Sequence, residues 1–152
     1  MDSDMASLPA HVTVRGEFDL VHIRDGVIIS NATIKNLVLN VGKEFVAKLI
    51  NGLHVAPFTH IQIGNGDNAA AVTDTHLYTF YTEAIGAASY AEGYKAVLSY
   101  TFQFNEITTI CEAGLCDGVQ AASPHMLSRQ VFAGRDVIKD DLLQVTWRIT
   151  VG

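Results

Sequence analysis

The sequence is short of charged residues and lacks any dense cluster of positive charge. Asp, Glu, Lys and Arg together make up 17% of the 152 residues, against about 25% in typical soluble domains. The ten Lys and Arg are scattered, and the formal net charge is −6. Phosphate backbones are bound by dense positive fields, so this composition argues against a DNA or RNA partner. With so few charges to keep its surface in water, the protein is expected to have part of that surface covered by another subunit.

Long apolar runs and a secretory leader are also absent. No window of the sequence approaches the roughly 20 apolar residues that a membrane-spanning helix needs. Met1 to Ala10 carries Asp2 and Asp4 without a basic residue, and it has neither the charged nor the apolar part of a signal peptide. We therefore expect a protein that is made in the cytoplasm and has no membrane partner.

Cysteine is scarce, with only Cys111 and Cys116 in the chain. No histidine flanks the pair, and a structural zinc site needs further soft ligands nearby. The spacing also differs from the CxxC pattern of redox proteins. Free thiols in a reducing compartment are the favoured interpretation, and a disulfide across a short loop is the alternative.

What the sequence does contain is a series of segments in which apolar and polar residues alternate. A period of two is typical of half-buried strands, and it is clearest at the end of the chain. Strands that follow one another without intervening helices predict a mainly β fold. We expect an antiparallel β-sandwich or flattened barrel of about seven to eight strands. Strands are predicted at 11–23, 27–30, 58–63, 94–104, 106–112, 125–132 and 142–151, with an extended segment at 76–85.

One amphipathic helix is predicted, from Asn40 to Leu53. Asn40 is its predicted N-cap, and Gly52 is near the C-terminus, where helices commonly stop. The length of the chain fits one domain, so we expect a flexible N-terminal arm at 1–9 and a single β-rich domain at 10–152. The apolar residues of the helix recur at spacings of three and four: Val41, Phe45, Val46, Leu49, Ile50 and Leu53.

Motifs for catalysis or cofactor binding are missing. The stretch Gly64-Asn65-Gly66-Asp67-Asn68 leads into neither the helix of a dinucleotide fingerprint nor the Gly-Lys-Ser/Thr ending of a P-loop. A turn that needs positive φ at glycine is the favoured interpretation. There is no GxSxG elbow, and alternation gives no reason to place two of Glu83, Glu106 and Glu112 in one cleft. We predict no catalytic residue, no cofactor and no enzymatic activity.

Metal ligands are present, but in no recognised pattern. Asp67, Asn68 and Asp74 offer oxygen atoms for calcium, at a spacing that matches no EF-hand loop. No two histidines stand at i, i+2 or i, i+4, so the sequence predicts no metal site. The six histidines are His11, His22, His54, His60, His76 and His125.

The order of several short motifs is more informative than any one of them. The first is HIQIGNGDNAAAVTDTHL, a strand followed by Gly-x-Gly, small residues and Asp-Thr-x-Leu; NEITTICEAGL, MLSRQVF and VIKDDLLQVTWRITV follow it. Over roughly Ala32 to Val151 this order resembles small virion structural proteins of tailed bacteriophages, which include tail-collar fibre domains and head-decoration (cement) proteins. The usual Glu-Ile-Gly-Leu appears here as Glu112 to Leu115, and Cys116 stands at a position that is often Phe.

The resemblance implies a capsid decoration (cement) protein in the virion. Such a protein binds the outer shell as a homo-oligomer and stabilises it by bridging subunits of the major capsid protein. The head is favoured because the chain ends directly after a strand, whereas a fibre domain of this type normally continues into a long extension. A disordered arm can fold onto a neighbour, so Ser7, Leu8 and Pro9 are the expected assembly interface.

Three alternatives remain open on sequence grounds. One is a tail, baseplate or fibre-attachment component with tail partners. Another is a host-surface glycan-binding module with tyrosine platforms, although Trp147 is expected to point into the core. A small hydrolase would require a polar cleft with convergent titratable groups. The tyrosines in question are Tyr78, Tyr81, Tyr90 and Tyr94.

Overall fold

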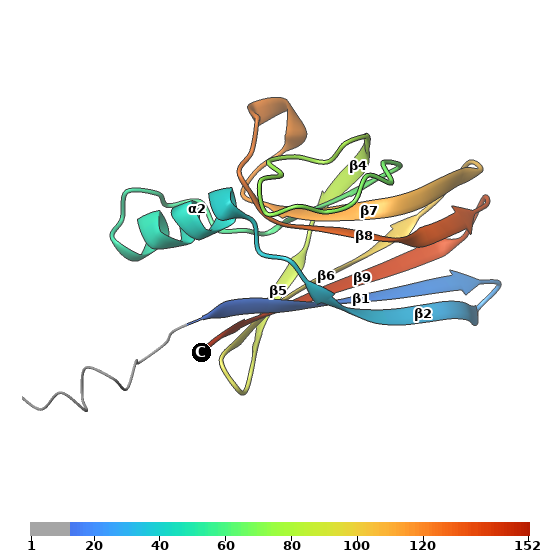
Figure 1. Ribbon diagram of the computed structural model, residues 1–152. Coiled ribbons are helices and arrows are strands. Elements are labelled where there is room, and N and C mark those ends of the chain that lie inside the picture. The colour runs from blue at the N-terminus through green and yellow to red at the C-terminus, as the bar shows by residue number, and fades with distance from the viewer. Residues whose placement is uncertain (1–12) are drawn as a thin grey trace, which may run out of the picture.

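Two antiparallel β-sheets stack face to face, with one α-helix at one end of the stack (Figure 1). The computed structural model describes residues 13–152. The predicted arm, with Ser7, Leu8 and Pro9, lies outside these described residues. Both sheets keep open edges, so the fold is a sandwich and not a closed barrel. The prediction of a mainly β, antiparallel sandwich is therefore confirmed.

The five-stranded sheet has the order β2-β1-β9-β6-β5, and the four-stranded sheet has the order β4-β3-β7-β8. Nine strands thus lie within residues 13–152. β1 pairs with both β2 and β9, which places the first and last described strands side by side. The bounds are β1 Val14–Arg24, β2 Val27–Asn36, α2 Asn40–Ile50, β3 His60–Gly64, β4 Phe80–Ile85, β5 Ala87–Ala91, β6 Lys95–Gln103, β7 Thr108–Cys116, η1 Gln120–Ala122, β8 Met126–Val137 and β9 Leu142–Val151.

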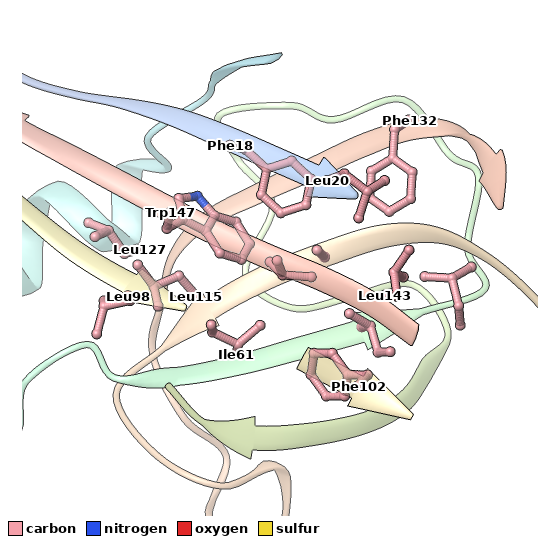
Figure 2. Packing of buried hydrophobic residues seen from close by; sticks show 14 of the residues in the cluster. Phe18, Leu20, Ile61, Leu98, Phe102, Leu115, Leu127, Phe132, Leu143 and Trp147 are labelled. Atoms are coloured by element: carbon pink, nitrogen blue, oxygen red, sulfur yellow. The ribbon is translucent and has the colours of Figure 1, made fainter. Parts of the chain in front are cut away.

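A hydrophobic core fills the space between the sheets, and three aromatic residues link its layers (Figure 2). Phe18 lies opposite Trp147 in the register of β1 and β9, and their ring centroids are 4.7 Å apart. Phe18 also stacks on Phe132 of the other sheet at 5.6 Å. Trp147 is fully buried, as its position in the alternating C-terminal strand predicts. Burying a large apolar side chain contributes about 1.5 to 3 kcal/mol, so these contacts hold the two sheets together.

The β1–β2 hairpin follows from its turn residues. Asp25 and Gly26 have φ values of 51° and 75°, the left-handed pair that a two-residue type I′ turn requires. The turn is therefore where the sequence predicts it. β2 continues to Asn36, well beyond the predicted end at residue 30, because it pairs with β1 along most of its length.

The helix α2 begins at Asn40, as predicted, but its N-cap and its C-terminal end differ from the prediction. Leu39, and not Asn40, is the N-cap, and no side chain caps the helix there. The helix ends at Ile50, followed by Gly52 with φ of 78°. Ile50 and Leu53 are 84% and 75% exposed, so the buried side of α2 is narrower than the apolar stripe. Within residues 13–152 no helix is long and apolar enough to cross a membrane.

Two other segments differ from the alternation pattern. β4 occupies only the second half of the predicted extended segment 76–85, and β5 was not predicted as a separate strand. Leu98 and Phe102 of β6 are buried, whereas Tyr100 of β6 and Tyr94, just before the strand, are exposed although all four alternate in the same register. Tyr94 has a φ of 65° and precedes the first paired residue of β6. The alternation of apolar and polar residues along β6 does not reveal how much of the strand is covered by the other sheet.

The two cysteines are free and buried. Both stand on β7: Cys111 Sγ donates to the carbonyl of Asn65 at 3.0 Å, whereas Cys116 packs with Leu39, Leu77 and Met126. Burial raises the pKa of both thiols. This arrangement agrees with the favoured interpretation of free thiols.

Gly42 sets how closely α2 approaches β8. A Cβ at this position would lie 2.5 Å from the carbonyl oxygen of Leu127 and 2.7 Å from its Cα. Backbone atoms cannot move aside as a side chain can, so any larger residue must push the helix away from the sheet.

We therefore expect Gly42→Ala to destabilise the protein by about 2 kcal/mol. In an unobstructed helix the same change would stabilise by about 1 kcal/mol, so the sign of the effect tests the contact. Urea unfolding followed by circular dichroism measures it. Lys43→Ala, at the exposed neighbouring position, is the control and should change stability by less than about 0.5 kcal/mol.

At the other end of the sandwich, Asp141 binds two residues of β1. Arg24 donates from Nε and Nη2 to the two carboxylate oxygens at 2.9 and 2.8 Å, and His22 Nε2 lies 2.8 Å from Oδ2. The backbone N–H of Ile138 donates a further bond. The Arg24 contact is the largest cause that holds the pKa of Asp141 well below its usual value, and His22 and Ile138 act in the same direction.

A lowered pKa in the folded state means that Asp141 stabilises the protein above the ordinary carboxyl pKa of about 4. This contribution is lost as the pH falls below that value. We expect Asp141→Asn to destabilise the protein at pH 6 and the difference from wild type to shrink by pH 3, measured by urea unfolding. Asp140→Asn controls for the change in net charge. A difference that does not depend on pH would contradict this account.

Candidate functional site

Three of the motifs noted in the sequence meet in one buried charge cluster, which consists of Asp74, Glu112 and Arg129. Glu112 comes from β7 and Arg129 from the adjacent strand β8. Asp74 comes from the 15-residue loop 65–79 that joins β3 to β4. Glu112 and Arg129 have no solvent exposure, and Asp74 is almost fully buried. The three residues stand in separate motifs of the sequence, and only the pairing of strands β3, β7 and β8 brings them together.

Glu112 uses both carboxylate oxygens to hold the loop. Its Oε2 accepts the backbone N–H groups of Gly66 at 2.7 Å and Thr79 at 2.8 Å. Its Oε1 accepts the N–H of Tyr78 at 2.9 Å and the Arg129 Nε at 3.0 Å. A buried carboxylate is tolerated only when it is paired and hydrogen-bonded, and here both ends of the loop supply the donors.

Arg129 extends the cluster to the middle of the same loop. Its Nη1 donates to Asp74 Oδ2 at 3.0 Å, and its Nη2 donates to the carbonyl of Asn68 at 3.0 Å. The guanidinium carbon also lies 4.4 Å from the centre of the Tyr78 ring. The planar, delocalised guanidinium suits such a site because it has several donors in a fixed geometry and stacks on aromatic rings.

Gly64 and Gly66 are required by this cluster and not by a left-handed turn. Neither glycine has positive φ, so the predicted turn with positive φ at glycine is wrong. A Cβ on Gly64 would lie 2.7 Å from Glu112 Oε2, and a Cβ on Gly66 would lie 2.4 Å from the same oxygen. Gly114, in the middle of β7, is likewise constrained by Met126, whose Cε would be 2.4 Å from an added Cβ. Close approach explains these glycines.

The geometry of the loop does not favour the calcium alternative. Asp74 Oδ2 is taken up by Arg129 and by the N–H of Ala71 at 2.9 Å. Asp67 and Asn68 are exposed, and the carbonyl of Asn68 already accepts from Arg129. A cation at this place would compete with a guanidinium that is already buried there.

The glutamates considered as a catalytic pair lie in different surroundings. Glu112 is buried in the cluster, whereas Glu83 accepts the backbone N–H of Gln120 at 2.9 Å. Glu106 accepts the hydroxyl of Tyr81, and this hydrogen bond raises the pKa of Tyr81 to about 12. The lone pairs of Glu112 are used by N–H donors, so this carboxylate is arranged to hold a loop and not to move a proton.

Large aliphatic side chains are exposed at the end of the sandwich that carries the β1–β2 turn. The registers place Ile23 opposite Leu142 and Leu142 opposite Gln103, so the β1–β2, β6–β7 and β8–β9 connections share this end. Exposure reaches 58% at Ile28 and 81% at Ile107. We call these residues the hairpin-end surface: Val27, Ile28 and Ile29 of β2, Ile107 between β6 and β7, and Ile138 between β8 and β9.

A second group of polar side chains lies near the opposite, helix end. His54 follows α2, Asp117 follows β7, and His125 precedes β8. One nitrogen of each histidine lies 2.8 Å from the same Asp117 oxygen, Oδ2. This group was not predicted from the sequence, because its members are 63 and 8 residues apart and no local spacing links them.

The comparisons with known proteins identify no relatives. No protein-family model, no curated protein and no solved structure matched the chain. The functional conclusions therefore rest on the residues and their arrangement.

If the buried charge cluster holds the loop, Arg129→Met should destabilise the protein by about 3 to 5 kcal/mol, because Glu112 and Asp74 stay buried without their partner. A double-mutant cycle with Glu112→Gln tests the pairing. The loss of stability in the double mutant should be smaller than the sum of the losses in the two single mutants, by more than about 1 kcal/mol. Urea unfolding provides both values.

Arg148→Met is the matched control, because Arg148 pairs with Glu17 and Asp19 on the partly exposed face of the five-stranded sheet. Its loss should cost no more than about 1 kcal/mol. If Arg129→Met does not fold, Arg129→Lys keeps the charge and should still cost more than Arg148→Met. Equal costs at the two positions would show that the buried charge cluster does not hold the loop.

Proposed function

We propose that this protein is a bacteriophage capsid decoration (cement) protein, which binds the outer shell and bridges neighbouring subunits of the major capsid protein. The observation that carries the proposal is the hairpin-end surface, together with the order of motifs that resembles small virion structural proteins. Scattered apolar residues on a surface are ordinary, but several at one end of a domain are typical of a contact site.

The open edge of β2 suits a protein partner. β2 is an edge strand that pairs only with β1 within residues 13–152, so one row of its backbone N–H and C=O groups faces outward. Such an edge can pair with a strand of another chain. Ile28 and its neighbours at the start of β2 would add apolar contacts to those backbone hydrogen bonds.

Decoration requires many modest contacts rather than one strong one. On a shell, the same contact is repeated by symmetry, and the avidity of a symmetric oligomer multiplies the effect of each contact. The arm at 1–9, with Ser7, Leu8 and Pro9, stays a predicted second contact. The sandwich would act as a rigid body that carries both, because the buried charge cluster holds its longest loop in place.

The location of the protein in a particle tests the proposal directly. Purified particles of the phage that encodes this chain would be labelled with an antibody against it, and its copy number would be measured by quantitative mass spectrometry. We expect label over the head and copies in the hundreds. Label confined to the tail, with six to a few dozen copies, would contradict the proposal of a decoration protein and favour a tail or baseplate component.

Ile28→Glu tests the surface itself. A charge in the centre of a contact must be desolvated without a partner, so we expect the variant to lose at least about tenfold in affinity for undecorated capsids in a sedimentation assay. Ile50→Glu, on the exposed side of α2 at the helix end, is the matched control and should bind as wild type. Equal binding by all three proteins would exclude the hairpin-end surface as the contact.

A further inference from the structure

His54, Asp117 and His125 bring three potential metal ligands to one point. His54 Nε2 and His125 Nδ1 each lie 2.8 Å from Asp117 Oδ2, and the three ligand atoms lie within 4.8 Å of one another. The residues come from three segments: the loop after α2, the end of β7 and the start of β8. Two imidazoles and one carboxylate form a donor set that zinc binds in proteins.

The surrounding residues hold two of the ligands in place. The N–H of His125 donates to Asp117 Oδ1 at 2.7 Å, and the N–H of Asp117 donates to the carbonyl of His125 at 3.1 Å. These bonds close the β7–β8 connection and orient the carboxylate, as hydrogen bonds from neighbouring groups orient the ligands of metal sites. The side chain of Asp117 is almost fully buried.

Phe45 of α2 positions both rings. It stacks on His125 with ring centroids 3.5 Å apart, and it meets the ring of His54 edge-on at 4.9 Å. The backbone of His54 is held in turn by a hydrogen bond from its N–H to the carbonyl of Lys48 at 3.0 Å. The two imidazoles are therefore oriented before any ion arrives, which lowers the cost of binding.

A second observation that points to a bound ion is the state of His54 Nε2. This atom is buried and has no hydrogen-bond partner within residues 13–152, although Asp117 Oδ2 is only 2.8 Å away. The contact thus has the distance of a hydrogen bond without its direction. A buried nitrogen without a partner is costly, and an ion placed beside the carboxylate would satisfy it.

We propose that His54 Nε2, His125 Nδ1 and Asp117 Oδ2 bind one divalent transition-metal ion, with Zn²⁺ as the best match. A tetrahedral zinc ion keeps its ligand atoms about 3.3 Å apart, so binding needs the 2.8 Å contacts to open by about half an ångström. Each imidazole binds in its neutral form with its proton on the other ring nitrogen. The fourth position is left for water or for a ligand from a partner, on the side where His125 is exposed.

The ion would join the loop after α2 to the β7–β8 connection. These segments are more than 60 residues apart in the chain, and a link that closes so long a loop stabilises the folded state. This inference does not depend on the proposed function.

The test is titration of the full chain, freed of any affinity tag, with Zn²⁺ in isothermal calorimetry and in thermal unfolding. We expect one ion per chain and a rise in Tm of about 5 to 10 °C at a hundredfold excess of free zinc over the dissociation constant. EDTA should reverse the rise. Co²⁺ in place of zinc should give the intense visible absorption of a four-coordinate site.

Asp117→Asn and His125→Gln should weaken binding more than about tenfold, whereas His60→Gln and His76→Gln should bind as wild type. Circular dichroism without metal checks that each variant is folded. His125 is partly exposed, so its variant keeps the test valid if His54→Gln or Asp117→Asn fails to fold. No saturable binding up to millimolar zinc would refute the site, and so would equal binding by His125→Gln and His76→Gln.

Discussion

The pairing of Glu112 with Arg129 inside the four-stranded sheet is the constraint on which the longest loop of the structure depends. Two charges without solvent contact must be compensated by good geometry and by further hydrogen bonds. Glu112 obtains them from the N–H groups of Gly66, Tyr78 and Thr79, and Arg129 obtains them from Asp74 and Asn68. The loop 65–79 has no strand or helix of its own, so these side chains replace the backbone bonds that a regular element would supply.

The buried charge cluster and the hydrophobic core lie away from the two ends of the sandwich, where the exposed features are found. The cluster is closed to solvent, and the core between the sheets is filled by Phe18, Trp147 and Phe132. The two ends of the sandwich carry the exposed features. The hairpin end has aliphatic side chains on an open edge, while the helix end has two histidines around one carboxylate as well as the exposed Ile50 and Leu53. No residue of the buried charge cluster belongs to either of these groups.

Sequence patterns predicted the elements whose signal is local. The alternation from Leu143 to Val151 predicted a strand with Trp147 buried, and Asp25-Gly26 predicted the turn of the first hairpin. Both follow from rules that act over a few residues. The pattern placed the start of α2 correctly but misjudged its N-cap and its buried face, since Leu39 caps it and Ile50 and Leu53 remain exposed. How wide a stripe is buried depends on the surface that the helix meets, and that surface is β8, which lies far away in the sequence.

The sequence by itself determined the class of the fold, because the period of two and the scarcity of helical segments allow little else for a chain of this length. It also predicted a need for glycine in the stretch that holds Gly64 and Gly66, but it gave positive φ as the reason, which is wrong. Only the tertiary structure decided that Gly64 and Gly66 leave room for the Glu112 carboxylate, and that His54 and His125 meet at Asp117. His125 and Asp117 are 8 positions apart, but the other contacts join residues that are 46 to 63 positions apart. The pairing of strands brings such residues together, and no local spacing in the chain records it.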